Sequence, residues 1–266
     1  RSRAPAAPRG KRQVASAACG SSGAIGKDMQ RVIITGASSG IGTAMAWHYA
    51  QRGAVLGLVA RREAALAQLA ARLPSATLIY PADVRDAAAL QAAAADFIAR
   101  HGCPDIVIAN AGVSIGTLTE FVADTLAFQD VIDINVVGMV KTFQPFLAAM
   151  RAAGRGTLVG IASVAGYRGL PGAGAYSASK AAAISYLESL RLELAPSGIK
   201  VITICPGYVA TPMTAQNPYP TPFLLSADAA ARKIAALIEH GQTFAVIPWQ
   251  MALVARVLRA LPNWLY

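Results

Sequence analysis

The chain has few of the residues that hold metals or cross-link a fold. Its three cysteines, Cys19, Cys103 and Cys205, are dispersed and lack metal-ligand spacing. An odd number of dispersed thiols is typical of a reducing compartment, so we expect the protein in the cytoplasm. The three histidines are equally scattered, and no Ser-His-Asp arrangement follows from local spacing. We therefore expect neither a metal site nor hydrolytic chemistry.

Charged residues are also scarce. They make up 14% of the 266 residues, against 55% hydrophobic residues, which is ample material for the core of one large domain. The net charge of +10 is uneven, because residues 1–28 hold six basic groups against Asp28 and so contribute half of it. The rest of the chain is only mildly basic, and nucleic acid is not an expected partner.

Residues 1–28 show no helix or strand pattern and are rich in Ala, Pro, Gly, Ser and Arg. We expect a disordered basic extension, with a transit peptide as the alternative because the segment bears Arg and Ser and is almost free of acids. A folded domain is expected over 29–248, followed by an apolar helical tail over 249–266.

Apolar runs alternate with helical patterns beyond residue 30. Strands are expected at 31–35, 55–60, 77–81, 105–110, 157–163, 201–207 and 244–248, and helices at 63–73, 87–102, 126–153 and 227–240. Such alternation predicts parallel strands with crossover helices, and the nearly continuous apolar strands predict a sheet covered on both faces. The fold class is therefore α/β, a Rossmann-type doubly wound parallel sheet of about seven strands.

A glycine-rich loop, GASSGIG, joins the first strand to a helical segment. Its glycines at 36, 40 and 42 allow a tight turn and a close approach of backbone to a pyrophosphate, which the free N–H groups of the helix start would face. The spacing differs from the common G-x-G-x-x-G fingerprint, but the strand before and the helix after supply the required context.

Tyr176 and Lys180 lie four residues apart in a helical pattern and so share one face. The phenol has a reference pKa of about 10, and bringing it to about 7 requires roughly 4 kcal/mol. An ammonium about 4 Å away supplies about 4 kcal/mol at an effective dielectric of 20, enough to make a working proton donor. Alone, such a pair is more often a solvated helix face.

Several separated motifs together resemble the short-chain dehydrogenase/reductase family over roughly residues 30–240. The matching positions are TGASSGIG at 35–42, NAG at 110–112, Asn135, Ser163, Tyr176, Lys180 and Pro206-Gly207. The resemblance implies that Tyr176 protonates a developing alkoxide and that Lys180 lowers its pKa and grips the cofactor ribose. It also implies that Ser163 binds the substrate oxygen and that Asn135 holds a water linking Lys180 to solvent.

The resemblance further implies a nicotinamide cofactor bound at the carboxyl ends of the strands. Asp83 and Val84 are expected to contact the adenine, and Val209 and Thr211 the carboxamide. The cofactor-binding residues expected in full are Gly36, Ser38, Ser39, Gly40, Ile41, Gly42, Arg61, Arg62, Asp83, Val84, Asn110, Ala111, Gly112, Tyr176, Lys180, Pro206, Gly207, Val209 and Thr211.

The second strand ends in VARRE, where no acid precedes Arg61 to hold a free ribose. A 2′-phosphate carries about −1.5 to −2 charge and calls for arginine. We therefore predict NADP(H), held by Arg61 with Arg62 and Ser38 as helpers. The alternative is that both arginines merely start a solvated helix.

The segment 212–225 contains four prolines together with Met213, Tyr219, Phe223 and Leu224. It is interpreted either as a semi-rigid apolar flap over a hydrophobic carbonyl substrate or as an ordinary surface loop.

The tail from Trp249 is interrupted by Arg256 and Arg259 and is too short and too charged to span a bilayer. We expect it to pack across a subunit interface or over the substrate mouth. The alternative is peripheral attachment to a membrane through Trp249, Trp264 and the arginines.

The sequence thus predicts an NADPH-dependent reductase or alcohol dehydrogenase that acts on a small-molecule carbonyl or alcohol as a homodimer or homotetramer. A 3-oxoacyl carrier-protein reductase is the alternative enzyme. A catalytically silent NADP-binding regulator is the alternative class, although the intact Ser163, Tyr176 and Lys180 speak against it.

Overall fold

The computed structural model describes residues 29–215 and 220–266, so the expectations for residues 1–28 and for Tyr219 lie outside it. Seven parallel strands form the central sheet in the order β3-β2-β1-β4-β5-β6-β9. They are β1 (Arg31–Thr35), β2 (Val55–Ala60), β3 (Thr77–Pro81), β4 (Ile106–Ala109), β5 (Gly156–Ile161), β6 (Ile199–Pro206) and β9 (Phe244–Ile247). All seven coincide with predicted strands to within two residues.

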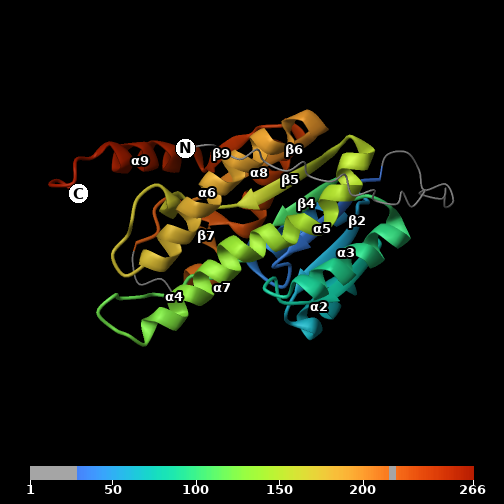
Figure 1. Ribbon diagram of the computed structural model, residues 1–266, viewed down its shortest axis with the longest axis horizontal. Helices are drawn as coiled ribbons and strands as arrows, with labels where there is room; N and C mark the ends of the chain where they lie inside the picture. Colours follow the sequence, from blue (N-terminus) through green and yellow to red (C-terminus); the bar gives the residue numbers. More distant parts are fainter. Residues whose placement is uncertain (1–28, 216–219) are drawn as a thin grey trace, which may run out of the picture.

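Helices cover both faces of this sheet. In one core cluster, Val32 and Ile34 of β1 pack against α1 (Gly40–Ala50), α2 (Glu63–Ala70) and α8 (Ala227–Glu239). The other takes Ile33 and packs it against α3 (Ala87–His101), α5 (Gly138–Ala153) and α6 (Gly174–Leu194), which lie in front of the sheet in Figure 1. Side chains alternate across a strand, so β1 feeds both cores, and the predicted doubly wound α/β fold is confirmed.

The strand order reverses between β1 and β4. Chain connections on either side of this point leave in opposite directions, which opens a crevice beyond the carboxyl ends of the two strands. The glycine loop after β1 and the NAG segment after β4 both enter this crevice.

The predicted helix at 126–153 changes its hydrogen-bonding pattern partway along its length. It consists of α4 (Asp124–Ile132), a π-helical turn η1 (Asp133–Val137) and α5. The continuous rod 124–153 is long and apolar enough to cross a membrane by length and composition. Phe143 and Met150 are nevertheless fully buried in the second core, as in the core helix of a globular domain.

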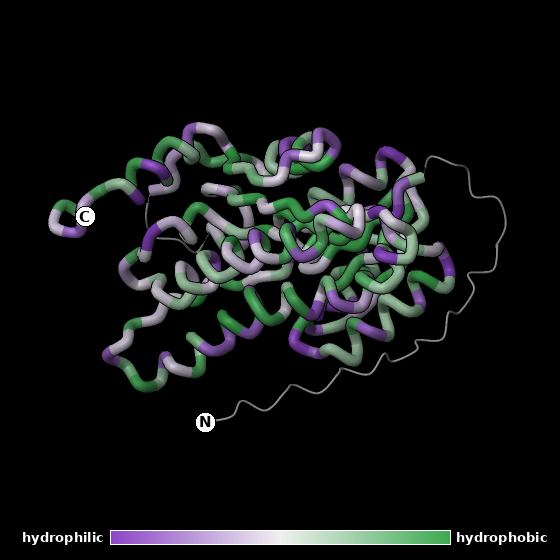
Figure 2. Tube along the Cα trace, turned by 45° about the horizontal axis from the view of Figure 1, so that its top comes forward, coloured by the Kyte–Doolittle hydropathy of each residue, from purple (hydrophilic) through white to green (hydrophobic). Residues whose placement is uncertain are grey.

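The smaller elements follow the last core strands. They are η2 (Val164–Gly166), η3 (Ala195–Ser197), α7 (Pro212–Ala215), the short parallel pair β7 (Val209–Ala210) and β8 (Leu225–Ser226), and α9 (Trp249–Ala260). Helix α9 extends beyond the edge of the sheet and leads to a projecting C-terminus (Figures 1 and 2).

Candidate active site

A cleft of about 330 Å³ opens at the carboxyl ends of the strands. Every predicted site residue lines it except Gly42 and Asn135. Residues that sequence reasoning missed also contribute, namely Ala60, Ala82, Val113, Ile134, Ile161 and Ala162. Most of these are apolar neighbours of the predicted positions, and only adjacency to a strand end could have indicated them.

The backbone of the glycine loop adopts a shape that only glycine accommodates without strain at its key positions. Gly36 and Gly40 have φ of +67° and +57°, where other residues are strained. Gly42 lies outside the cleft lining, but a Cβ there would overlap the carbonyl oxygen of Gly36. Among the described residues no side chain caps the start of α1, and its first turn holds no acid. Its free N–H groups therefore form a cradle suited to a pyrophosphate.

The end of β4 braces this cradle. The Asn110 amide Nδ2 donates to the carbonyl oxygens of Thr35, at 3.0 Å, and Gly36, at 3.3 Å. The backbone N–H groups of Asn110 and Ala111 donate to the Thr35 hydroxyl at 3.1 and 3.2 Å. The NAG segment thus holds the glycine loop in its cofactor-ready shape.

Ser163, Tyr176 and Lys180 converge on the same cleft from two elements. Ser163 follows β5, where its Oγ accepts the Ala165 N–H at 3.1 Å. Tyr176 and Lys180 lie on successive turns of α6, with the ammonium 5.7 Å from the centre of the phenol ring. The Lys180 Nζ donates to the Ile161 carbonyl oxygen at 2.9 Å, which fixes the lysine at the end of β5.

Burial dominates the electrostatics of this group, and the expected lowering of the pKa of Tyr176 by Lys180 stays a prediction. Burial raises the pKa of Tyr176, and hydrogen bonding to Ser163 acts in the opposite direction. Burial lowers the pKa of Lys180 to about 8. The phenol therefore stays protonated at neutral pH in this state, as a proton donor requires.

Asn135 lies in the π-helical turn and is fully buried. Its Oδ1 accepts the Val113 N–H at 2.8 Å, and its Nδ2 donates to the Val113 carbonyl and the Ser179 hydroxyl, each at 2.9 Å. The amide thus ties the helix to the loop after β4 and to α6. Its predicted water-holding role stays a prediction, while the structure gives it a bracing role. A π-turn is a frequent feature of functional sites.

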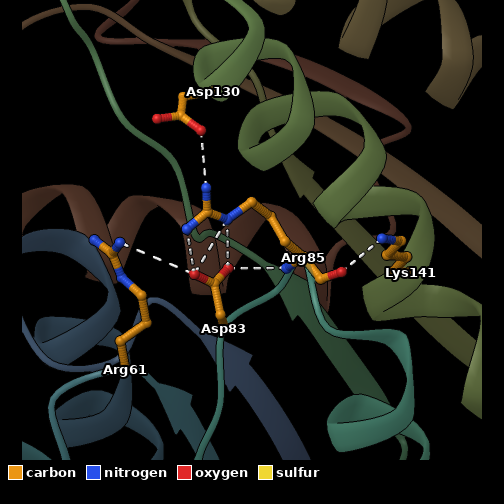
Figure 3. Close-up of polar contacts among 5 residues, drawn as sticks. All are labelled: Arg61, Asp83, Arg85, Asp130 and Lys141. Carbon is orange, nitrogen blue, oxygen red and sulfur yellow. Dashed lines mark hydrogen bonds and ion pairs between the residues drawn. The ribbon is translucent and has the colours of Figure 1, made fainter. Parts of the chain in front are cut away.

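The two arginines after β2 reach the far end of the cleft. Arg62 donates to the carbonyl and hydroxyl oxygens of Ser38, at 3.0 and 3.2 Å. The Arg61 side chain is 62% exposed, and its guanidinium lies 4.0 Å from the Asp83 carboxylate (Figure 3). That carboxylate is engaged more closely by Arg85, which lowers the pKa of Asp83.

The predicted substrate flap is only partly a wall of the cleft. Pro212, Met213 and Thr214 line it, whereas Phe223 and Leu224 are exposed. Phe223 has φ of +56°, an uncommon conformation for an aromatic residue.

Three catalytic-type side chains, an anion cradle and a doubly wound sheet define a dinucleotide-binding oxidoreductase. The chain matches the short chain dehydrogenase family over residues 30–220 and belongs to the short-chain dehydrogenase/reductase family, whose members bind a nicotinamide cofactor. These enzymes act on small molecules and generally form oligomers.

Individual relatives agree with this assignment. The chain is 38% identical over 237 residues to an uncharacterized oxidoreductase of Myxococcus xanthus, covering 88% of this chain and 93% of that one. It is 34% identical to a putative ketoacyl reductase of Streptomyces coelicolor, covering 81% and 85%.

Among solved structures, an alcohol dehydrogenase of the archaeon Thermococcus sibiricus complexed with 5-hydroxy-NADP superposes with a TM-score of 0.73. It shares 26% identity over 83% of this chain and 96% of that one. A short-chain dehydrogenase from Streptomyces avermitilis gives a TM-score of 0.77 at 27% identity, covering 88% and 93%.

Proposed function

We propose that this protein is an NADPH-dependent oxidoreductase that transfers hydride between the nicotinamide and a carbonyl or secondary alcohol of a hydrophobic small molecule. The observation that carries the proposal is the convergence of Ser163, Tyr176 and Lys180 on the cleft that the glycine loop closes at its other end. When bound, a reduced nicotinamide supplies hydride to a carbonyl carbon.

The residues of the chain supply the remaining chemistry. The Ser163 hydroxyl orients the carbonyl oxygen, and the protonated Tyr176 gives its proton to the alkoxide as charge develops there. Lys180 is fixed by the Ile161 carbonyl beside the phenol and stabilises the phenolate that remains. Gly112 leaves space next to Lys180 and Asn135, because a Cβ there would lie 3.5 Å from the lysine Nζ and 3.1 Å from the Asn135 Oδ1.

The preference for NADPH rests on charge. The carboxyl end of β2 presents Arg61 and Arg62 at the cleft, and no acid precedes Arg61 in the sequence VARRE. A guanidinium with a largely exposed side chain is suited to bind a dianionic 2′-phosphate.

A 3-oxoacyl thioester is the second candidate substrate, favoured by the likeness to the putative ketoacyl reductase of Streptomyces coelicolor. A silent regulator is the less favoured alternative, because it would have no use for the Ser163, Tyr176 and Lys180 group.

We propose a cytoplasmic homodimer or homotetramer. The stripe of Trp249, Leu253 and Val257 on α9 is exposed at successive helical turns, so it offers an apolar face for a second subunit. Peripheral attachment of this face to an anionic membrane is the alternative.

The test is a panel of aldehydes, ketones, steroids and 3-oxoacyl thioesters assayed for oxidation of NADPH and of NADH. Turnover of at least one carbonyl class with NADPH, together with its loss in Tyr176→Phe, supports the proposal. Binding of NADPH without turnover of any class supports the silent regulator instead.

A further inference from the structure

Asp83 places a negative charge at the end of the cleft where NADPH would carry its 2′-phosphate. Asp83 lines the cleft, and its Oδ2 lies 4.0 Å from Nη1 of Arg61, the arginine assigned above to the phosphate. An uncompensated carboxylate at this range would occupy Arg61 and repel the phosphate.

Arg85 neutralises the Asp83 carboxylate through an ion pair and several hydrogen bonds. Its Nη2 lies 2.8 Å from Oδ2 of Asp83, and its Nε lies 3.2 Å from both carboxylate oxygens (Figure 3). Its backbone N–H donates to Oδ1 at 2.9 Å. Both carboxylate oxygens of Asp83 therefore accept hydrogen bonds from Arg85, and Arg61 is the more distant partner.

Arg85 is itself held in place from two helices. Its Nη1 donates to Asp130 of α4 at 2.8 Å, and its carbonyl oxygen accepts from Lys141 of α5 at 2.6 Å. Arg85 is absent from the residues that line the cleft in the described part of the chain. Its position is that of a supporting residue that acts through Asp83.

We propose that Arg85 is a positioning residue for cofactor selection, which holds the Asp83 carboxylate and so leaves Arg61 free to bind a 2′-phosphate. The inference rests on the NADPH preference proposed above. It assigns part of that preference to a side chain that touches no cofactor, and it predicts that its effect vanishes once the Asp83 charge is removed.

The experiment measures binding of adenosine 2′,5′-bisphosphate and adenosine 5′-monophosphate by calorimetry, beside kcat/KM for NADPH and NADH. In Arg85→Ala the ratio of the two binding constants is expected to fall about tenfold, the size of one partly screened charge pair at 4 Å. Arg85→Lys keeps the positive charge but loses the several N–H donors of the guanidinium, so the ratio of the two binding constants is expected to be intermediate.

The decisive variant is Arg85→Ala in an Asp83→Asn background. Loss of the Asp83 adenine contact affects both nucleotides equally, so the ratio isolates the charge. In this background Arg85→Ala is expected to change the ratio by less than about twofold. Arg100→Ala is the matched control, since Arg100 pairs with Asp96 on α3 away from the cleft and its loss removes the same charge.

Several results would overturn the proposal. An equal fall in the ratio with and without the Asp83 charge would mean that Arg85 binds the phosphate itself or acts only on folding. An unchanged ratio in Arg85→Ala, in a wild type that does prefer the bisphosphate, would refute this inference alone. A wild type with no preference for the bisphosphate would refute the proposed NADPH preference, and the Arg85 inference with it.

Discussion

At the level of single side chains, Lys180 shows how strongly this fold modifies an ionisable group. The residue is buried and has one hydrogen-bond acceptor in the Ile161 carbonyl, with Tyr176 as its aromatic neighbour. Burial disfavours the charged form and lowers the pKa to about 8. A lysine poised near neutral pH can gain and lose a proton during turnover, which an exposed lysine does not.

Replacement of Lys180 by Met tests this burial cost. The unfolded chain keeps its lysine proton up to about pH 10.4, whereas the folded protein releases it near pH 8, so the stability of the wild type rises with pH between these values. Relative to Lys180→Met, the free energy of unfolding is expected to gain on the order of 3 kcal/mol over this range. Denaturant titrations of the cofactor-free proteins measure it. Parallel pH curves for the two proteins would show that Lys180 is not desolvated.

Arg61 provides the corresponding test at the far end of the cleft. Arg61→Asp replaces attraction with repulsion for a 2′-phosphate and is expected to move the preference from NADPH toward NADH by at least about a hundredfold in the ratio of kcat/KM. The exposed Arg72→Asp, which makes the same charge change on the loop after α2, is the control. If the ratio stays the same in Arg61→Asp, another group reads the phosphate.

At the level of elements, the π-helical turn η1 joins three parts of the site through one amide. Asn135→Ala would leave the Val113 N–H and carbonyl without their partner, and each unsatisfied buried group typically costs about 1–3 kcal/mol. We expect a loss of at least about 2 kcal/mol in the free energy of unfolding, together with lower turnover. Gln144→Ala, an exposed amide on the same rod, should be neutral within about 0.5 kcal/mol. Equal stability of the two variants would remove the bracing role.

Elements with a clear hydrophobic period were predictable from the sequence, and elements decided by tertiary contacts were not. The strands at 31–35, 55–60 and 77–81 match the structure residue for residue, because a parallel strand in a sheet flanked by helices is a mostly apolar run between turns. The π-turn leaves no such mark, and the partners of its Asn135, Val113 and Ser179, lie far away in the sequence. Cleft residues with chemically functional side chains, such as Arg61 and Lys180, were predicted from their sequence motifs.

Residues that act through another side chain were missed. Arg85 follows the expected adenine contact, Asp83, by two positions in the sequence. Only the folded structure shows that its guanidinium donates hydrogen bonds both to the Asp83 carboxylate and to Asp130. The direction of the pKa shift of Tyr176 was missed for the same reason, and the effect of Lys180 on it stays a prediction. Sequence spacing gave the pair but not the burial, which raises the pKa of the phenol.

At the scale of the whole molecule, the C-terminal segment is connected to the active site. Met251 packs against Gly207, where an added Cβ would lie 2.6 Å from its Cγ. Arg168, in the segment between Ser163 and Tyr176, donates to the Leu261 carbonyl and to Asn263 at 2.9 Å, and its guanidinium lies 4.2 Å from the ring centre of Tyr266. The tail therefore braces two of the segments that form the cleft.

Removal of residues 249–266 is expected to raise KM for the carbonyl substrate and to lower Tm in buffer without lipid, because these contacts to the cleft segments are lost. Kinetics and thermal melts measure both. As the matched variant, Leu253→Ser with Val257→Ser keeps the Met251 and Arg168 contacts and removes two of the three apolar side chains of the exposed stripe. It should keep substrate affinity and lose oligomer mass, measured by size-exclusion light scattering. A truncated protein that stays fully active and loses only pelleting with anionic vesicles would favour the membrane alternative.

The most direct test of the proposed hydride transfer follows the hydrogen atom that moves from the cofactor to the substrate. The protein is given NADPH carrying deuterium at the reactive C4 position and a carbonyl substrate from the panel, and the alcohol product is analysed by mass spectrometry. If the proposed hydride transfer takes place, the wild type gives one deuterium on the former carbonyl carbon, and Tyr176→Phe gives almost no product despite unimpaired NADPH binding. Product that lacks deuterium, or near-wild-type kcat in Tyr176→Phe, would contradict it.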